Sequence, residues 1–155
     1  MAPVGIKKAV NNGFTLLEVM VVIGIIGIMA SIIMSTSVQQ VEKSRSKKTQ
    51  ADLKTMKGAL DIYAMEEGRG KYPAEPDQVI AAMEGQGVAW EACRDGWDQP
   101  YAYYVNAEKT KYYLLSPGSG GEAETDDDIF VSEKQNPIRD YPPSIGAYEK
   151  ICASD

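Results

Sequence analysis

The sequence predicts an α+β protein in which one long N-terminal helix packs on a small antiparallel β-sheet. Three observations support this prediction: an apolar run at residues 14–34, an amphipathic pattern that continues it to residue 67, and short segments rich in tyrosine, valine and leucine after residue 100. A few short strands bury their apolar face only against a second layer, and the helix supplies that layer.

The composition of the chain narrows the function classes. Its 155 residues include 16 basic and 22 acidic side chains, and the net charge of −6 is not typical of a nucleic-acid-binding protein. Histidine, a common metal ligand and general base, is absent from the sequence. We therefore expect a protein that is not an enzyme and that binds no nucleic acid.

The apolar run at residues 14–34 contains a single charged side chain, Glu18. A helix of about 20 apolar residues spans the roughly 30 Å hydrocarbon core of a bilayer. Lys7 and Lys8 precede the run, and positive charge there keeps the preceding end of the chain in the cytoplasm. The sequence therefore predicts a single-pass membrane segment, with the rest of the chain outside the cytoplasm.

Glu18 is the unusual member of this run. An acid at the centre of a membrane helix costs roughly 2.5 to 3.5 kcal/mol on insertion scales, and less near an interface. No basic residue lies between Phe14 and Gln40 to pair with it, so we expect a partner from another chain or from a new amino terminus. A removable signal peptide, with Ala30 and Ser31 as its cleavage site, is the alternative interpretation of the run.

The segment GFTLLEVMVVIGIIGIMASII closely resembles the class III signal of type IV pilins and type II secretion pseudopilins. The resemblance implies that a prepilin peptidase cuts between Gly13 and Phe14 and then methylates the new amino terminus of Phe14. It also implies that Glu18 recruits the subunit into a filament and neutralises the terminal amine of a neighbour. Many relatives carry proline where Ser35 stands, which leaves open how far the helix keeps its shape inside a filament.

An amphipathic pattern continues the helix beyond the apolar run. Apolar residues recur at helical spacing on one face, namely Val38, Val41, Leu53, Met56, Leu60 and Tyr63. We expect residues 35–52 to face solvent or other subunits and residues 53–67 to pack on the head. Gly68, Gly70 and Pro73 end the helix.

The basic residues of this helix form the cluster Lys43, Arg45, Lys47 and Lys48. The cluster has two interpretations. It contacts lipid head groups or acidic neighbours in a filament, or it is an ordinary solvated helix face.

The second half of the chain predicts the remaining elements. Residues 73–85 form a short helix that begins near Pro76 and ends at Gly85. Residues 101–105, 111–115 and 128–132 form strands, and the first two are joined as a hairpin. The tail after residue 132 contains Pro137, Pro142 and Pro143, so we expect ordered coil there, not a long helix or a central strand.

The head extends the resemblance to the major pseudopilins of type II secretion systems. The similar segments are QADLKTMKGALDIYAMEEGRGKYP, DGWDQPYAYY and YYLLSPGSGGEAETDDDI, so the similarity covers about residues 6–132. In the second segment, Gly96 and Asp98 replace a proline and a glycine of the family.

The resemblance implies a type IV pilin-like fold and a structural subunit of a periplasmic pseudopilus filament. The expected partners are further copies of the chain, prepilin peptidase, minor pseudopilins, the membrane, and an inner-membrane assembly platform with its ATPase. A type IV pilin of a surface fibre is the alternative, and a monomeric membrane-anchored binding protein is a third possibility.

Four parts of the chain follow from the patterns and the resemblance together. Residues 1–13 are expected to be a leader peptide, and residues 14–34 a transmembrane helix that also forms the filament core. Residues 35–67 continue the spine helix, and residues 68–155 form the globular head with its C-terminal tail.

The acidic loop SPGSGGEAETDDDI, residues 116–129, is the candidate metal site. Calcium takes six to eight oxygen ligands. The resemblance implies that Asp126 and Asp128 hold one calcium ion together with the carbonyl groups of Leu115 and Ser116. One aspartate of the family pattern is missing here, and a solvated acidic turn is the alternative.

The two cysteines, Cys93 and Cys152, match no metal-ligand spacing. Outside the cytoplasm a disulfide between them is chemically allowed, and it would tie the tail to the segment before the first strand. Two free thiols are the alternative.

Overall fold

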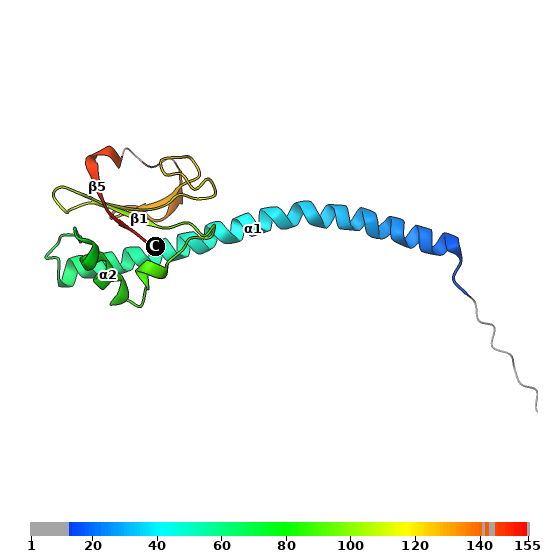
Figure 1. The fold of residues 1–155 in the computed structure, drawn as a ribbon, viewed down its shortest axis with the longest axis horizontal. Helices are drawn as coiled ribbons and strands as arrows, with labels where there is room; N and C mark the ends of the chain where they lie inside the picture. Colours follow the sequence, from blue (N-terminus) through cyan, green and yellow to red (C-terminus); the bar gives the residue numbers. More distant parts are fainter. Residues whose placement is uncertain (1–12, 141, 143–144, 155) are drawn as a thin grey trace, which may run out of the picture. The chain divides into compact units, whose positions relative to one another are not determined.

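The structure is a computed structural model that describes residues 13–140, 142 and 145–154, without the side chains of residues 32–37. The chain forms two compact units, Met1–Gln40 and Val41–Asp155. Helix α1 (Leu16–Glu66) belongs to both units, and the other elements belong to the second (Figure 1). The predicted α+β class is confirmed.

Helix α1 contains 51 residues and confirms the long helix predicted from the sequence. In the first unit its apolar side chains are exposed, from 51% for Val19 to 86% for Phe14 just before the helix. By length and hydropathy, no helix among the described residues qualifies as a membrane span.

Helix α1 ends where Gly68 and Gly70 predict the end of a helix. The N–H groups of Gly68 and Gly70 donate to the carbonyl oxygens of Tyr63 and Ala64, at 2.8 and 2.7 Å. Gly70 has φ +86°, a left-handed conformation that glycine adopts without a steric penalty. Helix α2 (Pro76–Glu84) follows with proline in its first turn, as predicted.

The sheet contains five strands in the order β4-β3-β2-β1-β5, and every neighbouring pair is antiparallel. The three predicted strands are confirmed as β1 (Ala102–Asn106), β2 (Tyr112–Ser116) and β3 (Ile129–Ser132). They lie at the centre of the sheet because each pairs with its sequence neighbour.

The tail adds the two edge strands, β4 (Ile138–Arg139) and β5 (Tyr148–Ala153). The expectation of ordered coil is wrong for these residues, while the expectation that the tail forms no central strand is confirmed. Backbone groups make the pairing: beyond the end of β5, Ser154 N–H donates to the Tyr101 carbonyl oxygen at 2.9 Å. Every residue type except proline supplies both groups, so the side-chain pattern gave no signal.

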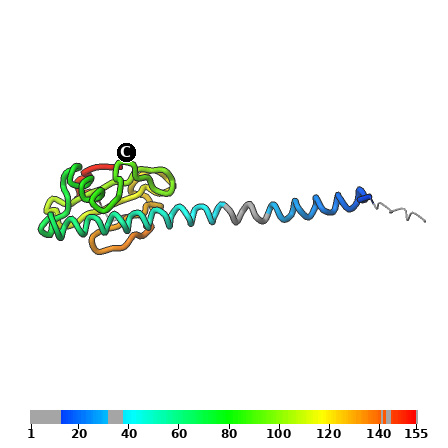
Figure 2. Tube along the Cα trace, turned by 90° about the horizontal axis from the view of Figure 1, so that it is seen from below, coloured from blue at the N-terminus to red at the C-terminus, as the bar shows by residue number. Residues whose placement is uncertain are grey.

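One face of the sheet packs on α1 and forms the main core. Its buried side chains are Leu53, Met56, Ala59, Leu60, Val79, Met83, Trp90, Tyr101, Tyr103, Val105, Tyr112, Leu114, Ile129 and Val131. Figures 1 and 2 show the second half of α1 running along this face. The spine helix is therefore also the second layer of the head.

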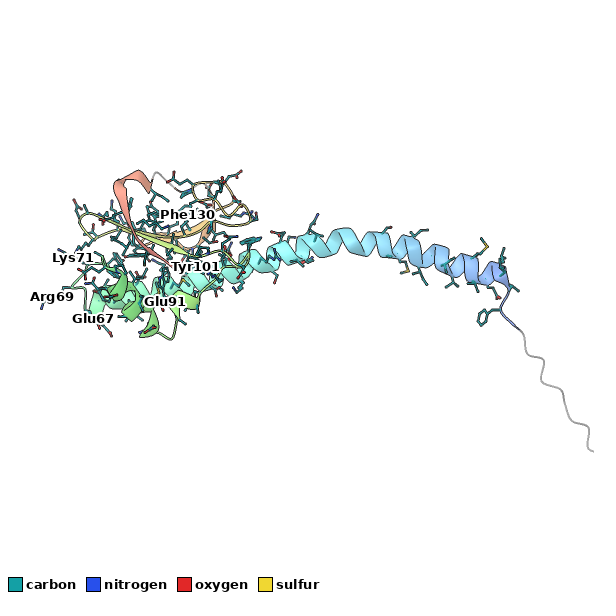
Figure 3. The ribbon with its side chains drawn as sticks, viewed as in Figure 1. Glu67, Arg69, Lys71, Glu91, Tyr101 and Phe130 are labelled. Carbon is teal, nitrogen blue, oxygen red and sulfur yellow. The ribbon has the colours of Figure 1, made fainter. Side chains whose placement is uncertain are left out.

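The opposite face of the sheet is covered by the tail. Leu115 and Phe130 of the sheet are buried against Ile145, and Ile138 and Tyr148 pack around them. In Figure 3, Phe130 lies farther from α1 than Tyr101 does. The tail thus closes the face that α1 leaves open.

Contact between α1 and the head begins earlier than the sequence predicted. Within the stretch 35–52, Thr49 is fully buried, and its hydroxyl oxygen accepts a hydrogen bond from Gly96 N–H at 2.9 Å. Trp97 Nε1 donates to Glu42 Oε2 at 3.0 Å. The expectation that these residues face only solvent or other subunits is therefore wrong for this side of the helix.

The turn that makes this contact needs a glycine. A Cβ atom at Gly96 would overlap the backbone of Arg45, so no other residue fits without a shift of the helix or the turn. Lys48 Nζ adds hydrogen bonds to the carbonyl oxygens of Arg94 and Asp95, at 2.7 and 3.1 Å. These contacts hold the turn against α1.

Candidate functional site

The peptide bond between Gly13 and Phe14 lies outside α1, which begins at Leu16. Phe14 is 86% exposed, and an atom added at the Cβ position of Gly13 would meet nothing within 4 Å. Backbone that is exposed and not helical is open to a peptidase. The remainder of the expected leader, residues 1–12, lies outside the described residues.

Glu18 closes a capping box at the start of α1. Its Oε2 atom accepts hydrogen bonds from Thr15 N–H at 2.9 Å and from the Thr15 hydroxyl at 3.1 Å. In return, Glu18 N–H donates to Thr15 Oγ1 at 3.2 Å. This reciprocal arrangement satisfies backbone donors that a helix N-terminus otherwise leaves without partners.

The capping box gives Glu18 a partner inside its own chain, which the sequence reasoning missed. The signal was present, because threonine followed three residues later by glutamate is the usual pattern of a capping box. The positive end of the helix dipole also favours an acid at this position. Helix geometry therefore explains why a carboxylate is tolerated at the start of an apolar helix.

Capping leaves Glu18 able to bind a second group. Both side-chain hydrogen bonds end on Oε2, and Oε1 accepts none from the residues that the structure describes. An ionised carboxylate offers about four lone-pair positions. A neighbouring amine can therefore pair with Glu18 without breaking the cap.

The acidic loop between β2 and β3 is organised by Asp127. Its Oδ2 atom accepts hydrogen bonds from Gly120 N–H at 2.6 Å and from the Ser119 hydroxyl at 2.9 Å, and Oδ1 accepts one from the Thr125 hydroxyl at 2.6 Å. The hydrogen bond from Thr125 contributes most to lowering the pKa of Asp127 to about 2, and the bonds from Gly120 and Ser119 add to it. The sequence analysis singled out the flanking aspartates and missed this one.

Asp128 holds the other end of the same loop. It is fully buried, and its Oδ2 atom accepts the N–H groups of Glu124 and Thr125 at 2.8 and 3.3 Å. Burial raises the pKa of the Asp128 carboxyl, and these hydrogen bonds partly offset that rise. Asp126, between the two organising aspartates, is exposed.

A buried link joins the loop to the turn on α1. Ser116 donates its hydroxyl to Asp95 Oδ2 at 2.6 Å, and both residues are at most 3% exposed. Asp95 Oδ1 accepts the N–H groups of Trp97 and Gln99, each at 2.8 Å. Asp95 therefore connects β2 to the turn through buried hydrogen bonds.

The residues predicted to bind calcium lie at the two ends of the acidic loop. Leu115 and Ser116, whose carbonyl groups are the predicted ligands, end β2. Asp126 is exposed, and Asp128 is buried and accepts loop N–H groups. Across the described part of the chain, no three His, Cys, Asp or Glu side chains are grouped to hold a metal ion. Calcium therefore stays a prediction for a measurement in solution.

Cys93 and Cys152 are both free cysteines, so the disulfide that the sequence allowed is not formed in the structure. Each is partly buried and packs against the main core. Burial raises the pKa of Cys152 to about 11, and a hydrogen bond from Trp90 opposes that rise. Burial also raises the pKa of Cys93, so both thiols are protonated near neutral pH.

A capped apolar helix that continues onto an antiparallel sheet defines a type IV pilin-like protein. The profile of the family described as "Type II secretion system (T2SS), protein G" matches residues 36–132. A second profile, the "Prokaryotic N-terminal methylation motif", matches residues 8–34, which include the predicted cleavage site and Glu18.

Relatives of this chain from several bacteria carry the description type II secretion system core protein G. The protein of Aeromonas hydrophila is 36% identical over 135 residues, which cover 79% of this chain and 93% of the relative. That of Escherichia coli K12 is 33% identical over 131 residues, covering 77% and 89%. That of Klebsiella pneumoniae is 34% identical over 116 residues, covering 74% and 81%. No solved structure matches the chain significantly.

The chain therefore belongs to the type II secretion system protein G family, the major pseudopilins. The predicted resemblance is confirmed, and the surface-fibre alternative is not favoured. The members of the protein G family are structural subunits. The methylation motif implies processing by prepilin peptidase within the secretion system.

Proposed function

We propose that this chain is the repeating structural subunit of a periplasmic pseudopilus that drives type II protein secretion. The observation that carries the proposal is the exposed apolar surface of α1, where side chains from Phe14 to Met29 are more than half exposed. The described residues of one copy leave this surface uncovered. A filament of many copies buries it against neighbouring helices, and the hydrophobic effect then favours assembly.

Before assembly, the same surface lies in lipid. The chain is anchored in the inner membrane by a single pass through residues 14–34, with Lys7 and Lys8 in the cytoplasm and the head in the periplasm. Prepilin peptidase cuts between Gly13 and Phe14 and methylates the new amino terminus. The match of the methylation motif and the exposure of Phe14 support this step.

Glu18 is the assembly residue of the processed subunit. Its Oε1 atom binds the methylated amine of Phe14 on a neighbouring copy, while Oε2 keeps the capping box closed. Both charges lie where the dielectric constant is low, so each is unfavourable without the other. Only cleavage of the leader creates the amine of Phe14. The pairing that aligns neighbouring helices therefore forms only after the leader is removed.

The filament acts mechanically, without chemistry of its own. Its partners are further copies of this chain in a helical array, minor pseudopilins at its tip, and an inner-membrane platform whose ATPase supplies the energy. The net charge of −6 gives no reason to include nucleic acid among them.

A deletion strain tests the proposed function. Loss of this chain should abolish release of the exoproteins that cross the outer membrane, and these proteins should accumulate folded in the periplasm. Overproduction should give filaments visible by electron microscopy that contain the processed chain. Unchanged secretion, with loss of surface fibres or of twitching, would instead assign the chain to a type IV pilus.

A further inference from the structure

The structure divides the basic cluster of α1, which consists of Lys43, Arg45, Lys47 and Lys48, into two pairs. Arg45 and Lys48 are engaged within the copy: Arg45 lies 3.8 Å from Glu42, and Lys48 lies 3.6 Å from Asp52 and donates to backbone carbonyl groups. Lys43 forms no ion pair or side-chain hydrogen bond with any described residue, and neither does Lys47. These two exposed ammonium groups are therefore available to a partner.

Lys43 and Lys47 share a surface groove with a third cation, Arg139 of β4. Residues Glu42, Lys43, Ser46, Lys47, Gln50 and Arg139 line this groove, which we call the basic groove. The Arg139 guanidinium lies 5.9 Å from the ring centre of Trp97, and Trp97 is held by its hydrogen bond to Glu42. Arg139 thus reaches the helix from a strand far away in the sequence.

The basic groove carries excess positive charge. Its one carboxylate, Glu42, accepts the Trp97 hydrogen bond and pairs with Arg45. Lys43, Lys47 and Arg139 form no ion pair with the part of the chain that the structure describes. An acidic segment complements this surface better than an apolar one does.

The tip of the acidic loop presents the complementary charges. Glu122, Glu124 and Asp126 are exposed, and no described residue forms an ion pair or side-chain hydrogen bond with their carboxylates. The two organising aspartates fix the backbone beneath them, including Glu124 at φ +67°. The tip therefore presents exposed carboxylates on a backbone that Asp127 and Asp128 hold in place.

We propose that, in the pseudopilus, the acidic loop tip of one copy docks into the basic groove of a neighbouring copy. The proposal rests on the proposed filament function. Among the described residues of one copy, no ion pair joins the two surfaces, although they carry opposite charges. In a filament, every copy presents both surfaces, so one heterologous contact repeats along the assembly and links heads whose helices already pack together.

Charge reversal in the full-length chain tests this contact. The groove variant Lys47→Glu with Arg139→Glu, and the loop variant Glu122→Lys with Glu124→Lys, should each lower the yield of sheared filaments at least several-fold. The chain that carries all four changes should recover most of the yield, because the pairing is restored with opposite signs. Lys54→Glu, an exposed and unpaired position on the same helix outside the groove, is the matched control and should change little.

Four further results decide the interpretation. Equal melting temperatures of the detergent-solubilised variants separate lost docking from lost folding. Normal filament yield in both double variants would overturn the docking contact, and so would a yield that does not recover in the chain with all four substitutions. In either case, wild-type filaments would still support the subunit function. Absence of wild-type filaments would instead reject the proposed function itself. If only the groove variant loses yield, and it also binds phosphatidylglycerol vesicles less well, the groove contacts lipid and the docking proposal is wrong.

Discussion

The two parts of helix α1 carry similar apolar residues, but these are exposed in the first part and buried in the second. In the first unit, Ile23 and Ile28 are 61% and 66% exposed, whereas in the second unit Leu53, Met56 and Leu60 are at most 1% exposed. The later residues pack on a sheet supplied by the same chain. The earlier residues have no such layer in the copy, so their burial requires lipid or other subunits.

The difference shows that the two parts of one helix bury their apolar side chains in different ways. The head does so within one copy, because α1 and the tail cover both faces of the sheet. The N-terminal part buries its apolar side chains against other subunits when the filament assembles. Mutations in the core of the head should therefore act on the stability of the single chain, while mutations in the N-terminal part should act on the filament.

The largest expected effect comes from truncating a core side chain of the second unit. Leu60→Ala should lower the free energy of unfolding of the detergent-solubilised full-length chain by about 2 to 5 kcal/mol, because the removed atoms leave a cavity. Ile25→Ala, at a residue that is 53% exposed, should change it by less than about 0.5 kcal/mol. Equal losses in denaturant titrations would break the comparison.

The turn that binds α1 should be the next most sensitive feature. Gly96→Ala should destabilise the head by about 1 to 3 kcal/mol, because its Cβ would overlap the backbone of Arg45. Gly58→Ala is the control with the opposite sign: its Cβ would meet nothing within 4 Å, and alanine favours a helix interior by about 0.5 to 1 kcal/mol. Thermal unfolding of the two variants distinguishes these effects, and stabilisation by Gly96→Ala would contradict the tight contact.

The sequence predicted the helices and the central strands because their side-chain patterns are periodic. It missed β5 because edge pairing uses backbone groups, and it missed Asp127 because three adjacent aspartates look alike in a sequence. The capping box could have been predicted, because threonine at position 15 and glutamate at position 18 have the spacing of this motif. Arg139 in the basic groove could not be predicted, because only the folded tail brings it to the helix.

The acidic loop should show a smaller, pH-dependent effect. Asp127→Asn should cost about 1 kcal/mol at neutral pH through weakened hydrogen bonds, whereas Asp126→Asn should cost almost nothing. The pKa of Asp127 is about 2 in the folded chain, below its unfolded value. Its stabilisation is therefore complete above about pH 4 and is lost as the pH falls toward 2.

A comparison of unfolding midpoints at pH 7 and pH 2.5 measures this loss. The gap between wild type and Asp127→Asn should shrink at the lower pH, while the gap for Asp126→Asn should stay near zero. Burial raises the pKa of Asp128 in all three chains, and the charge of Asp127 adds to that rise. Asp127→Asn removes this addition at pH 7, which makes the expected shrinkage of its gap smaller but does not reverse it. A gap for Asp127→Asn that widens toward pH 2.5 would disprove the assigned hydrogen bonds.

The smallest expected effect is that of calcium on the isolated full-length chain. Asp127 and Asp128 already hold the loop through protein donors, so excess calcium or a chelator should leave the melting temperature unchanged. A ligand that binds only the folded state would raise the melting temperature with its concentration. Such a rise in calorimetry, absent in an Asp128→Asn variant, would restore the calcium site that the sequence suggested.

The most direct test of the account is the filament yield of Glu18→Gln. Glutamine at this position keeps a capping acceptor for Thr15 but removes the negative charge, so folding and membrane retention should be normal and filaments should be lost. Thr15→Ala, which weakens the cap and keeps the charge, should still give filaments. Normal filament yield from Glu18→Gln would contradict the assembly role of Glu18 and the account of the N-terminal segment built on it.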